Sequence, residues 1–274
     1  MEHPTIITRA DDFGSAHAAN QAILQAVTSG CLIRNVSCMA VGPAIENGAH
    51  LLRNCDNIDI GLHLTLISEW DSVKWTPAAP KERIPSLLDK NGEFYQSQQQ
   101  LASARPKIEE ILLEYEAQWN RLTSLGLEVK YVDSHMAPEL LIPELEKALE
   151  EWISNKGLID ASKYYYFAEP PLPAWGDNTQ DFLHNSEIWL NSILPDNQYI
   201  YIMHPAMKRD DTFQFANEHF SPGMVQRERE LEYQSAISQK WKDWLKDRSI
   251  HVLRYSEAVP RGRSNDVLRK LLNL

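Results

Sequence analysis

The chain has 274 residues, of which 43% are hydrophobic and 24% charged, as in ordinary globular proteins. This composition argues against disorder, and the length suits one α/β domain, because β/α barrels reach this size undivided. A net charge of −11 without a run of Lys and Arg argues against nucleic acid as a partner.

Membrane and disulfide signals are weak in this sequence. No stretch of about eighteen apolar residues occurs, and the N-terminus shows no basic segment followed by an apolar one, so we expect a cytoplasmic location and no membrane partner. Cys31, Cys38 and Cys55 show no CxxC spacing, which predicts reduced, mostly buried thiols. We treat 1–274 as one domain and leave its oligomeric state open, with a homodimer as one option.

Short β-branched or aromatic runs that end in polar residues alternate with longer stretches of helical periodicity. This rhythm predicts an α/β fold, a single-domain β/α-barrel-like architecture with about seven strands. In chain order we expect a strand at 5–10, a helix at 16–30 capped by Ser15, strands at 36–41 and 58–66, a helix at 106–125, a strand at 129–132, a helix beginning at Pro138 or Pro143, strands at 163–167 and 199–203, a helix at 224–247 and a strand at 250–255, with a further helix at 43–52. Two irregular stretches, 68–104 and 168–180, are too long for simple connections and are typical of substrate-contacting loops.

Asp11 and Asp12 directly follow the first strand, where β/α proteins build their active sites. One carboxylate could ligate a metal while the other accepts a proton from water. Taken alone, the pair is equally typical of a turn or a helix N-cap.

His63 lies in the apolar run at 58–66, where a buried imidazole needs a partner or a metal. A single strand histidine is more often a hydrogen-bonded core residue than a ligand. Gly61, two residues earlier, indicates a close approach of another group to the backbone.

Two later strands also end in chemically useful groups. Asp133 and His135 close the strand at 129–132, so His135 could ligate a metal while Asp133 orients an imidazole, although a capping role is as reasonable in isolation. His204 follows the strand at 199–203, and Pro205 restricts it to extended geometry.

The coincidence of four strand ends carries more weight than any one motif. Two imidazoles and a carboxylate suit Zn²⁺, Mg²⁺ or Mn²⁺ with positions left open for water and substrate. We therefore expect a catalytic site for one divalent ion, Mg²⁺ or Zn²⁺, on Asp12, His63 and His135. Nucleotide-binding loops, the HExxH motif and the GxSxG elbow are absent from the sequence.

Aromatic residues in the irregular stretches are candidate sugar contacts. Trp70, Trp75 and Trp175 could each stack on a sugar face, or serve equally well as packing anchors. We take Trp70 and Trp175 as candidate substrate-binding residues.

Taken together, the segments RADDFG at 9–14, GLHLTL at 61–66, VDSH at 132–135, MHP at 203–205 and RERELEY at 227–233 resemble the YdjC-like family of carbohydrate deacetylases. The resemblance covers about residues 5–258, and their order and spacing also match. It implies a β/α-barrel-like fold, a divalent cation, and removal of N-acetyl groups from amino-sugar oligosaccharides such as chitooligosaccharides.

The resemblance also assigns roles to individual residues. Asp12, His63 and His135 would be the metal ligands, and Asp11 would resemble the general base. His204 looks like the second acid–base or oxyanion-stabilising group, while Arg227 and Glu230 look like supporting residues, Arg227 as a candidate substrate contact.

One departure and two rival interpretations remain. Many family members continue the third motif as DSHxH, whereas this chain has Ala137 in the last position, which bears on substrate identity. NodB-type polysaccharide deacetylases also begin with a DD pair, but they use an HxxxH ligand spacing that does not follow Asp12 here. A non-catalytic sugar-binding or regulatory protein on the same scaffold is the other alternative, against which Asp11 and His204 argue.

Overall fold

A parallel sheet forms the centre of the computed structural model, which describes residues 3–29, 32–164, 172–195 and 197–260. The hydrogen-bonded order is β5-β4-β3-β2-β1-β6, and β7 pairs with β1. Every pair is parallel, as helical crossovers require. The predicted α/β scaffold with about seven strands is thus confirmed. The strands are β1 (Thr5–Phe13), β2 (Asn35–Cys38), β3 (Asp59–Leu64), β4 (Val129–Ser134), β5 (Ile159–Asp160), β6 (Gln198–Met203) and β7 (His251–Leu253).

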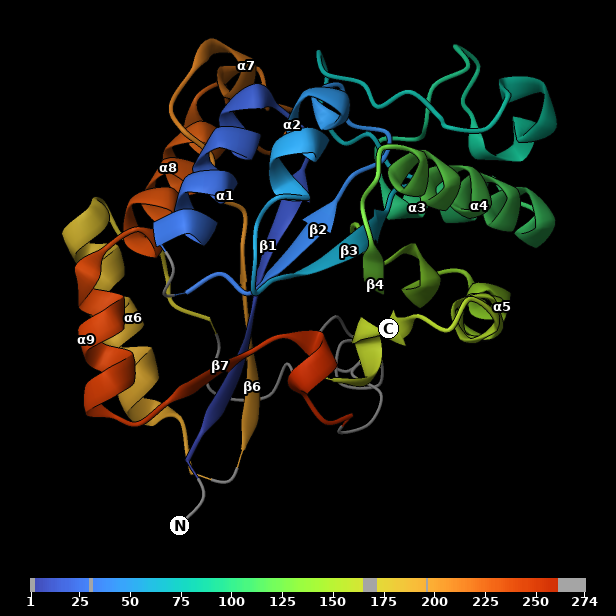
Figure 1. The fold of residues 1–274 in the computed structure, drawn as a ribbon. Coiled ribbons are helices and arrows are strands. Elements are labelled where there is room, and N and C mark those ends of the chain that lie inside the picture. Colours follow the sequence, from blue (N-terminus) through green and yellow to red (C-terminus); the bar gives the residue numbers. More distant parts are fainter. Residues whose placement is uncertain (1–2, 30–31, 165–171, 196, 261–274) are drawn as a thin grey trace.

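Helices lie around the outside of this curved sheet, with α1, α2 and α8 on one side and α4 and α5 on the other (Figure 1). None of the described helices is long and apolar enough to cross a membrane. The α-helices are α1 (His17–Ser29), α2 (Ile45–Leu52), α3 (Gln98–Ser103), α4 (Ile108–Ser124), α5 (Pro143–Asn155), α6 (Thr179–Ser192), α7 (Asp210–Phe213), α8 (Met224–Ala236) and α9 (Gln239–Asp247). The 3₁₀ turns are η1 (Lys81–Arg83), η2 (Pro85–Leu87), η3 (Pro138–Leu140), η4 (Ala161–Lys163) and η5 (Tyr255–Glu257).

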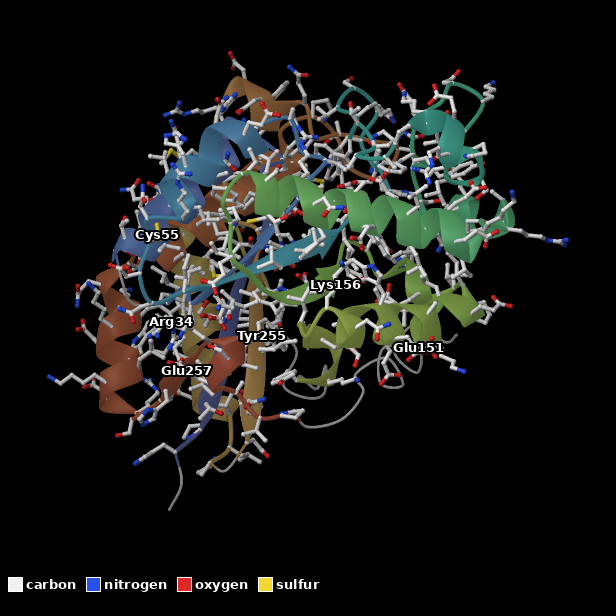
Figure 2. The ribbon with its side chains drawn as sticks, turned by 45° about the vertical axis from the view of Figure 1, so that its right-hand side comes forward. Arg34, Cys55, Glu151, Lys156, Tyr255 and Glu257 are labelled. Atoms are coloured by element: carbon white, nitrogen blue, oxygen red, sulfur yellow. The ribbon has the colours of Figure 1, made fainter. Side chains whose placement is uncertain are left out.

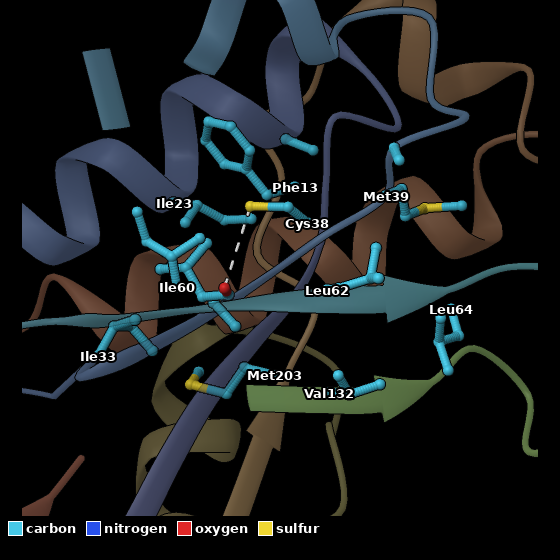
Figure 3. Close-up of a cluster of buried hydrophobic side chains, with 14 of the residues drawn as sticks. Phe13, Ile23, Ile33, Cys38, Met39, Ile60, Leu62, Leu64, Val132 and Met203 are labelled. Carbon is cyan, nitrogen blue, oxygen red and sulfur yellow. Dashed lines mark hydrogen bonds between the residues drawn. The ribbon is translucent and has the colours of Figure 1, made fainter. Parts of the chain in front are cut away.

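The main core lies between the sheet and the helices. All residues of β2 and β3 are buried, because helices and loops cover both faces of a parallel sheet. Figure 3 shows part of this core, in which Phe13 and Ile23 lie beside the buried thiol of Cys38. Cys38 and the half-buried Cys55 are free thiols, as predicted, whereas Cys31 lies outside the described residues.

Side chains alternate between the two faces of each strand, and the polar residues near the strand ends lie on the face opposite the main core. A smaller buried cluster of Ile7, Tyr131, Ala161, Ile200 and Tyr255 fills its lower part. Side chains two residues further along these strands lie on the same face, above this cluster. The cluster is therefore the floor of whatever site the strand ends form.

The turn η5 packs on this same face of the sheet. Its Tyr255 ring lies 4.4 Å from that of Tyr131, and the Tyr255 N–H donates to Asn35 Oδ1 at 2.9 Å. Arg34 and Glu257, which lie close together in Figure 2, add an ion pair at 3.8 Å. These contacts tie the end of the described chain to β2 and β4.

The irregular stretch at 68–104 is folded against α4 by two buried carboxylates. Glu114 accepts hydrogen bonds from the Ala78 and Ala79 amides at 2.9 and 2.8 Å, and Glu110 accepts one from Ser86 at 2.7 Å. Such bonds satisfy backbone groups that lack a strand or helix partner. The stretch therefore has a fixed shape despite its few regular elements.

Several predicted elements differ from the observed ones. The helix expected at 224–247 is two helices, because the Ser238 side chain caps α9 by accepting from the Lys240 amide. The hydroxyl of Ser15 has no hydrogen-bond partner among the described residues, so the predicted cap was wrong. Helix α6 was not predicted, although Asn178 caps it through two backbone amides. The strand expected at 163–167 begins in η4, and its residues 165–167 lie outside the described residues.

Candidate active site

Strand alternation brings the predicted functional residues to one face. Arg9 and Asp11 follow Ile7 on β1 in steps of two, and Asp133 follows Tyr131 on β4. His63 pairs in register with Asp133, one strand away. The site therefore lies at the carboxyl ends of β1, β3 and β4, where the sequence placed it.

Gly61 makes this arrangement possible on β3. A Cβ atom there would lie 2.3 Å from the ring of Tyr131, so only glycine leaves room for the tyrosine. The Tyr131 hydroxyl reaches across to Ser37 Oγ at 2.8 Å. The close approach that Gly61 indicated is therefore that of a side chain on the floor of the site.

Asp12 breaks the alternation of β1. Its φ of 63° is in the left-handed region, which aspartate tolerates better than most residues but which still costs energy. A register shift between Ala10 and Phe13 accompanies this turn. Asp12 is consequently turned toward His63 and His135, while Asp11 lies close to His63 on the strand.

The three predicted metal ligands come together in the structure. Asp12 Oδ1 lies 3.5 Å from both His63 Nε2 and His135 Nδ1, and the two ring nitrogens lie 3.3 Å apart. A point equidistant from three atoms with these separations is about 2.0 Å from each, the usual distance of zinc to imidazole nitrogen. All three residues are buried, and Asp12 Oδ1 has no hydrogen-bond donor among the described residues. The geometry and the donor types therefore fit a single divalent cation.

Each of the three predicted ligands is held by a second polar side chain. Asp133 Oδ2 lies 2.6 Å from His63 Nδ1, and Glu69 Oε2 lies 3.1 Å from His135 Nε2. Each carboxylate selects the tautomer that leaves the other ring nitrogen free for a metal. Arg229 donates to Asp12 Oδ2 at 2.7 Å, which leaves Oδ1 as the free oxygen.

The electrostatics of the cluster favour positive charge. Burial alone would lower the pKa of His63 and of His135, but nearby carboxylates, chiefly Asp133 and Glu69 respectively, raise them to about 10 and about 9. Burial would raise the pKa of Asp12, yet Arg229 and the two imidazoles hold it well below its usual value. The protein thus presents an anionic carboxylate and a negative potential, which attract protons or a metal ion.

Asp11 lies beside the cluster in a buried ion pair. Arg9 donates to both of its oxygens, from Nε at 2.6 Å and Nη2 at 2.7 Å, and Nη2 also lies 3.3 Å from Asp133 Oδ2. The fork fixes the orientation of the Asp11 carboxylate. Asp11, His63 and Asp133 also lie close enough to be a second ligand group, but both of its carboxylates already form ion pairs with Arg9.

His204 approaches from the neighbouring strand. Ala10 pairs in register with Met203, and Asp11 and His204 are the residues that directly follow this last pair. The His204 side chain is 40% exposed, and its Nδ1 lies 4.0 Å from Glu232 Oε2, which also accepts the His204 backbone N–H. His204 is outside the ligand triangle, as its predicted acid–base role requires.

The candidate substrate-binding residues occupy very different environments. Trp70 is 6% exposed and stacks on Phe215 at 5.4 Å, so it acts as a packing anchor and offers little of its ring to a sugar. Trp175 is 42% exposed and donates to Glu232 Oε1 at 3.0 Å. Arg227 is exposed and donates to the carbonyls of Gly176 and Asp177, which holds the loop beside Trp175.

Four residues of this site were missed in the sequence. Arg9 could have been found, because it stands two residues before Asp11 on the same face of a strand. Arg229 and Glu232 lie in the 227–233 segment, whose charges alone do not tell which face is buried. Glu69 lies in an irregular stretch where no periodicity marks it.

Comparison with known proteins places this geometry in a family. The profile of the YdjC-like protein family matches residues 5–247. The chain belongs to this family. The match spans β1 to β6, and it therefore includes all three residues of the ligand triangle.

Curated relatives of this YdjC-like chain carry related names. A carbohydrate deacetylase of Geobacillus stearothermophilus is 34% identical over 129 residues, 47% of this chain and 48% of that protein. One of Brevibacillus brevis is 31% identical over 54% of this chain and 56% of its own length. The chain thus spans about half the length of these two relatives. Carbohydrate deacetylase 2 of Listeria innocua is 25% identical over 93% of this chain and 99% of its own length.

Solved structures share the fold. A candidate cellobiose-phosphate cleavage protein of Enterococcus faecalis V583 matches with a TM-score of 0.64 and 21% identity, over 94% of this chain and all of that one. A CE4 esterase of Streptococcus mutans matches with a TM-score of 0.51 and 14% identity, over 91% and 86% of the two chains. At these identities the likeness concerns the fold alone.

Proposed function

We propose that this YdjC-like protein is a divalent-metal-dependent hydrolase that removes N-acetyl groups from amino-sugar oligosaccharides. The observation that carries the proposal is the buried triangle of Asp12 Oδ1, His63 Nε2 and His135 Nδ1, with separations of 3.3–3.5 Å. The names of its relatives, carbohydrate deacetylase and chitooligosaccharide deacetylase, support the substrate class. Three protein ligands leave coordination positions open, as a catalytic site needs.

Asp12, His63 and His135 would hold the cation. When bound there, a divalent ion polarises the carbonyl of the acetamide and makes water a better nucleophile. Imidazole ligands favour Zn²⁺, whereas Mg²⁺ prefers oxygen ligands. Two imidazoles and a carboxylate therefore make Zn²⁺ the better match of the two ions.

Asp11 would accept the proton of the attacking water. Its oxygens are held by Arg9 at 2.6 and 2.7 Å, so the carboxylate is fixed in place, and each oxygen keeps a lone pair for a further donor. Arg9 joins Asp11 to Asp133 and through it to His63. The base and a ligand are thus positioned by one buried network.

His204 would protonate the departing amine. Glu232 lies on the Nδ1 side of the ring, which leaves Nε2 to face the substrate. The carboxylate also fixes the backbone at this position and accepts from Trp175. Trp175 and His204 line one apolar cavity of about 480 Å³ together with Glu232, so an acetylated sugar that reaches His204 would also meet this indole.

The test is acetate release from a panel of N-acetylated amino-sugar oligosaccharides. We expect turnover by the wild-type protein and its loss, together with metal, in His63→Ala. A folded, metal-loaded wild-type protein that binds these sugars but releases no acetate would instead support the non-catalytic sugar-binding alternative. The matched control is His50→Ala, because His50 is an exposed histidine on α2.

A further inference from the structure

Two cavities lined mostly by polar residues lie next to each other beside the site. The larger, of about 930 Å³, is formed within the irregular stretch at 68–104, which includes α3, and the smaller, of about 330 Å³, lies between this stretch and residues 217–219. Both are lined by Asp71, Gln96 and Gln100. We call the two cavities together the distal groove. Its two parts have sizes typical of ligand sites.

The distal groove begins one side chain away from the metal ligands. Glu69 lines its smaller cavity, and Glu69 Oε2 lies 3.1 Å from His135 Nε2. The Glu69 backbone is held in turn by Asn217, whose Nδ2 donates to its carbonyl at 3.1 Å. The smaller cavity and the ligand triangle therefore share Glu69 as a common neighbour.

The side chains of the distal groove suit a polyhydroxylated molecule. Amides and carboxylates offer both donors and acceptors, which sugar hydroxyl groups need. The half-buried ring of Tyr95 adds an apolar surface for a sugar face. Five carboxylates and two lysines line the groove, so it favours neutral or cationic sugar units over anionic ones.

Resting on the proposed function, we propose that the distal groove binds the sugar units adjoining the one that is deacetylated. The substrate class is then an oligosaccharide of uncharged or amino-bearing units, and a single N-acetylated sugar is a poor substrate. Because Glu69 borders the smaller cavity, the sugar units next to the reacting one would contact this cavity, and units further along would contact the larger cavity.

Helix α3 offers matched variants for the test. Gln100 lines both cavities, Gln99 lines only the larger, and Gln98 lines neither. We expect Gln100→Ala to weaken binding of an N-acetylglucosamine tetrasaccharide about three- to tenfold, the effect of losing one or two hydrogen bonds. Gln99→Ala should weaken the tetrasaccharide but not the disaccharide, and Gln98→Ala should change neither.

Binding is measured by titration calorimetry with the metal-loaded full chain carrying Asp11→Asn, and melting temperatures verify folding. Gln99→Ala provides a second readout, because Gln100 Oε1 also accepts the Gln96 backbone N–H at 3.1 Å and its loss could disturb the loop. Equal affinities in all three variants, or no gain in affinity from one sugar unit to four, would contradict the proposal that sugar units bind in the distal groove.

Acetate release by the wild-type protein is measured separately, so that the two proposals fail in different ways. Oligosaccharide binding that depends on Gln100 without any acetate release keeps the groove and rejects the deacetylase. Acetate release that is equally efficient on one unit and four, and unaffected by Gln100→Ala, keeps the deacetylase and rejects the groove.

Discussion

Glu69 should control how tightly the protein holds its metal, although it is not a ligand. Its carboxylate lies 3.1 Å from His135 Nε2, and both side chains are at least 90% buried. Glu69→Gln keeps an acceptor for this N–H but removes the charge, whereas Glu69→Ala leaves the N–H without its partner. Removing such an outer partner typically lowers metal affinity about 10- to 100-fold, or about 1.4–2.7 kcal/mol.

The two substitutions separate charge from orientation. We expect Glu69→Gln near the lower end of this range and Glu69→Ala near the upper end, measured by competition with a chromogenic zinc chelator. Glu151→Gln is the control, because Glu151 is 66% exposed on α5 (Figure 2) and its ion pair is with Lys147 on the same helix. If both Glu69 variants fold and bind zinc as tightly as the wild type, His135 is not oriented by Glu69 and the reasoning is refuted.

Three further predictions concern Asp11, His204 and Glu139. Asp11→Asn should retain the metal, measured by mass spectrometry, but lose about 10²- to 10⁴-fold in acetate release and some stability, because Arg9 loses a buried ionic partner; a fully active variant would remove Asp11 as the base. His204→Ala should lower turnover by about 10²- to 10⁴-fold with unchanged metal affinity, and a lower melting temperature with unchanged turnover would show a purely structural role. Burial raises the pKa of Glu139 to about 7, so its neutral form is the stable one in the fold and stability falls as the pH rises from about 4.5 to 7. The unfolding free energy of Glu139→Gln relative to wild type, measured in urea titrations, should therefore rise by about 2–3 kcal/mol from pH 4.5 to pH 8. A difference between the two proteins that does not change with pH would contradict this.

The strand ends were predictable because two local signals coincide there. An apolar run marks each strand, and a carboxylate or imidazole near its end marks the edge where the carboxyl ends of parallel strands lie together. Asp12, His63 and His135 could be named on this basis, and the resemblance in the same segments added their roles. The positive φ of Asp12 was not predictable, because it depends on the register shift in β1.

Tertiary packing determines the roles of residues whose burial and contacts cannot be predicted from the sequence. Trp70 and Trp175 both lie in irregular stretches, but the burial of Trp70 depends on Phe215 and Phe220, about half the chain away. Arg229 looks like one charge among several on α8 until the helix packs against α1 and α6, where Arg229 contacts Asp12. Glu69 meets His135 only because 68–104 folds back over the strand ends.

The most direct test of the central claim is the metal dependence of acetate release. The protein is stripped with a chelator, its acetate release from an N-acetylglucosamine oligosaccharide is measured, and Zn²⁺ or Mg²⁺ is then added in steps. We expect the stripped protein to be inactive and activity to return in proportion to metal until one ion per chain is bound, with His135→Ala unable to recover. Full acetate release by the stripped protein, or equal recovery by His135→Ala, would contradict a catalytic metal on Asp12, His63 and His135.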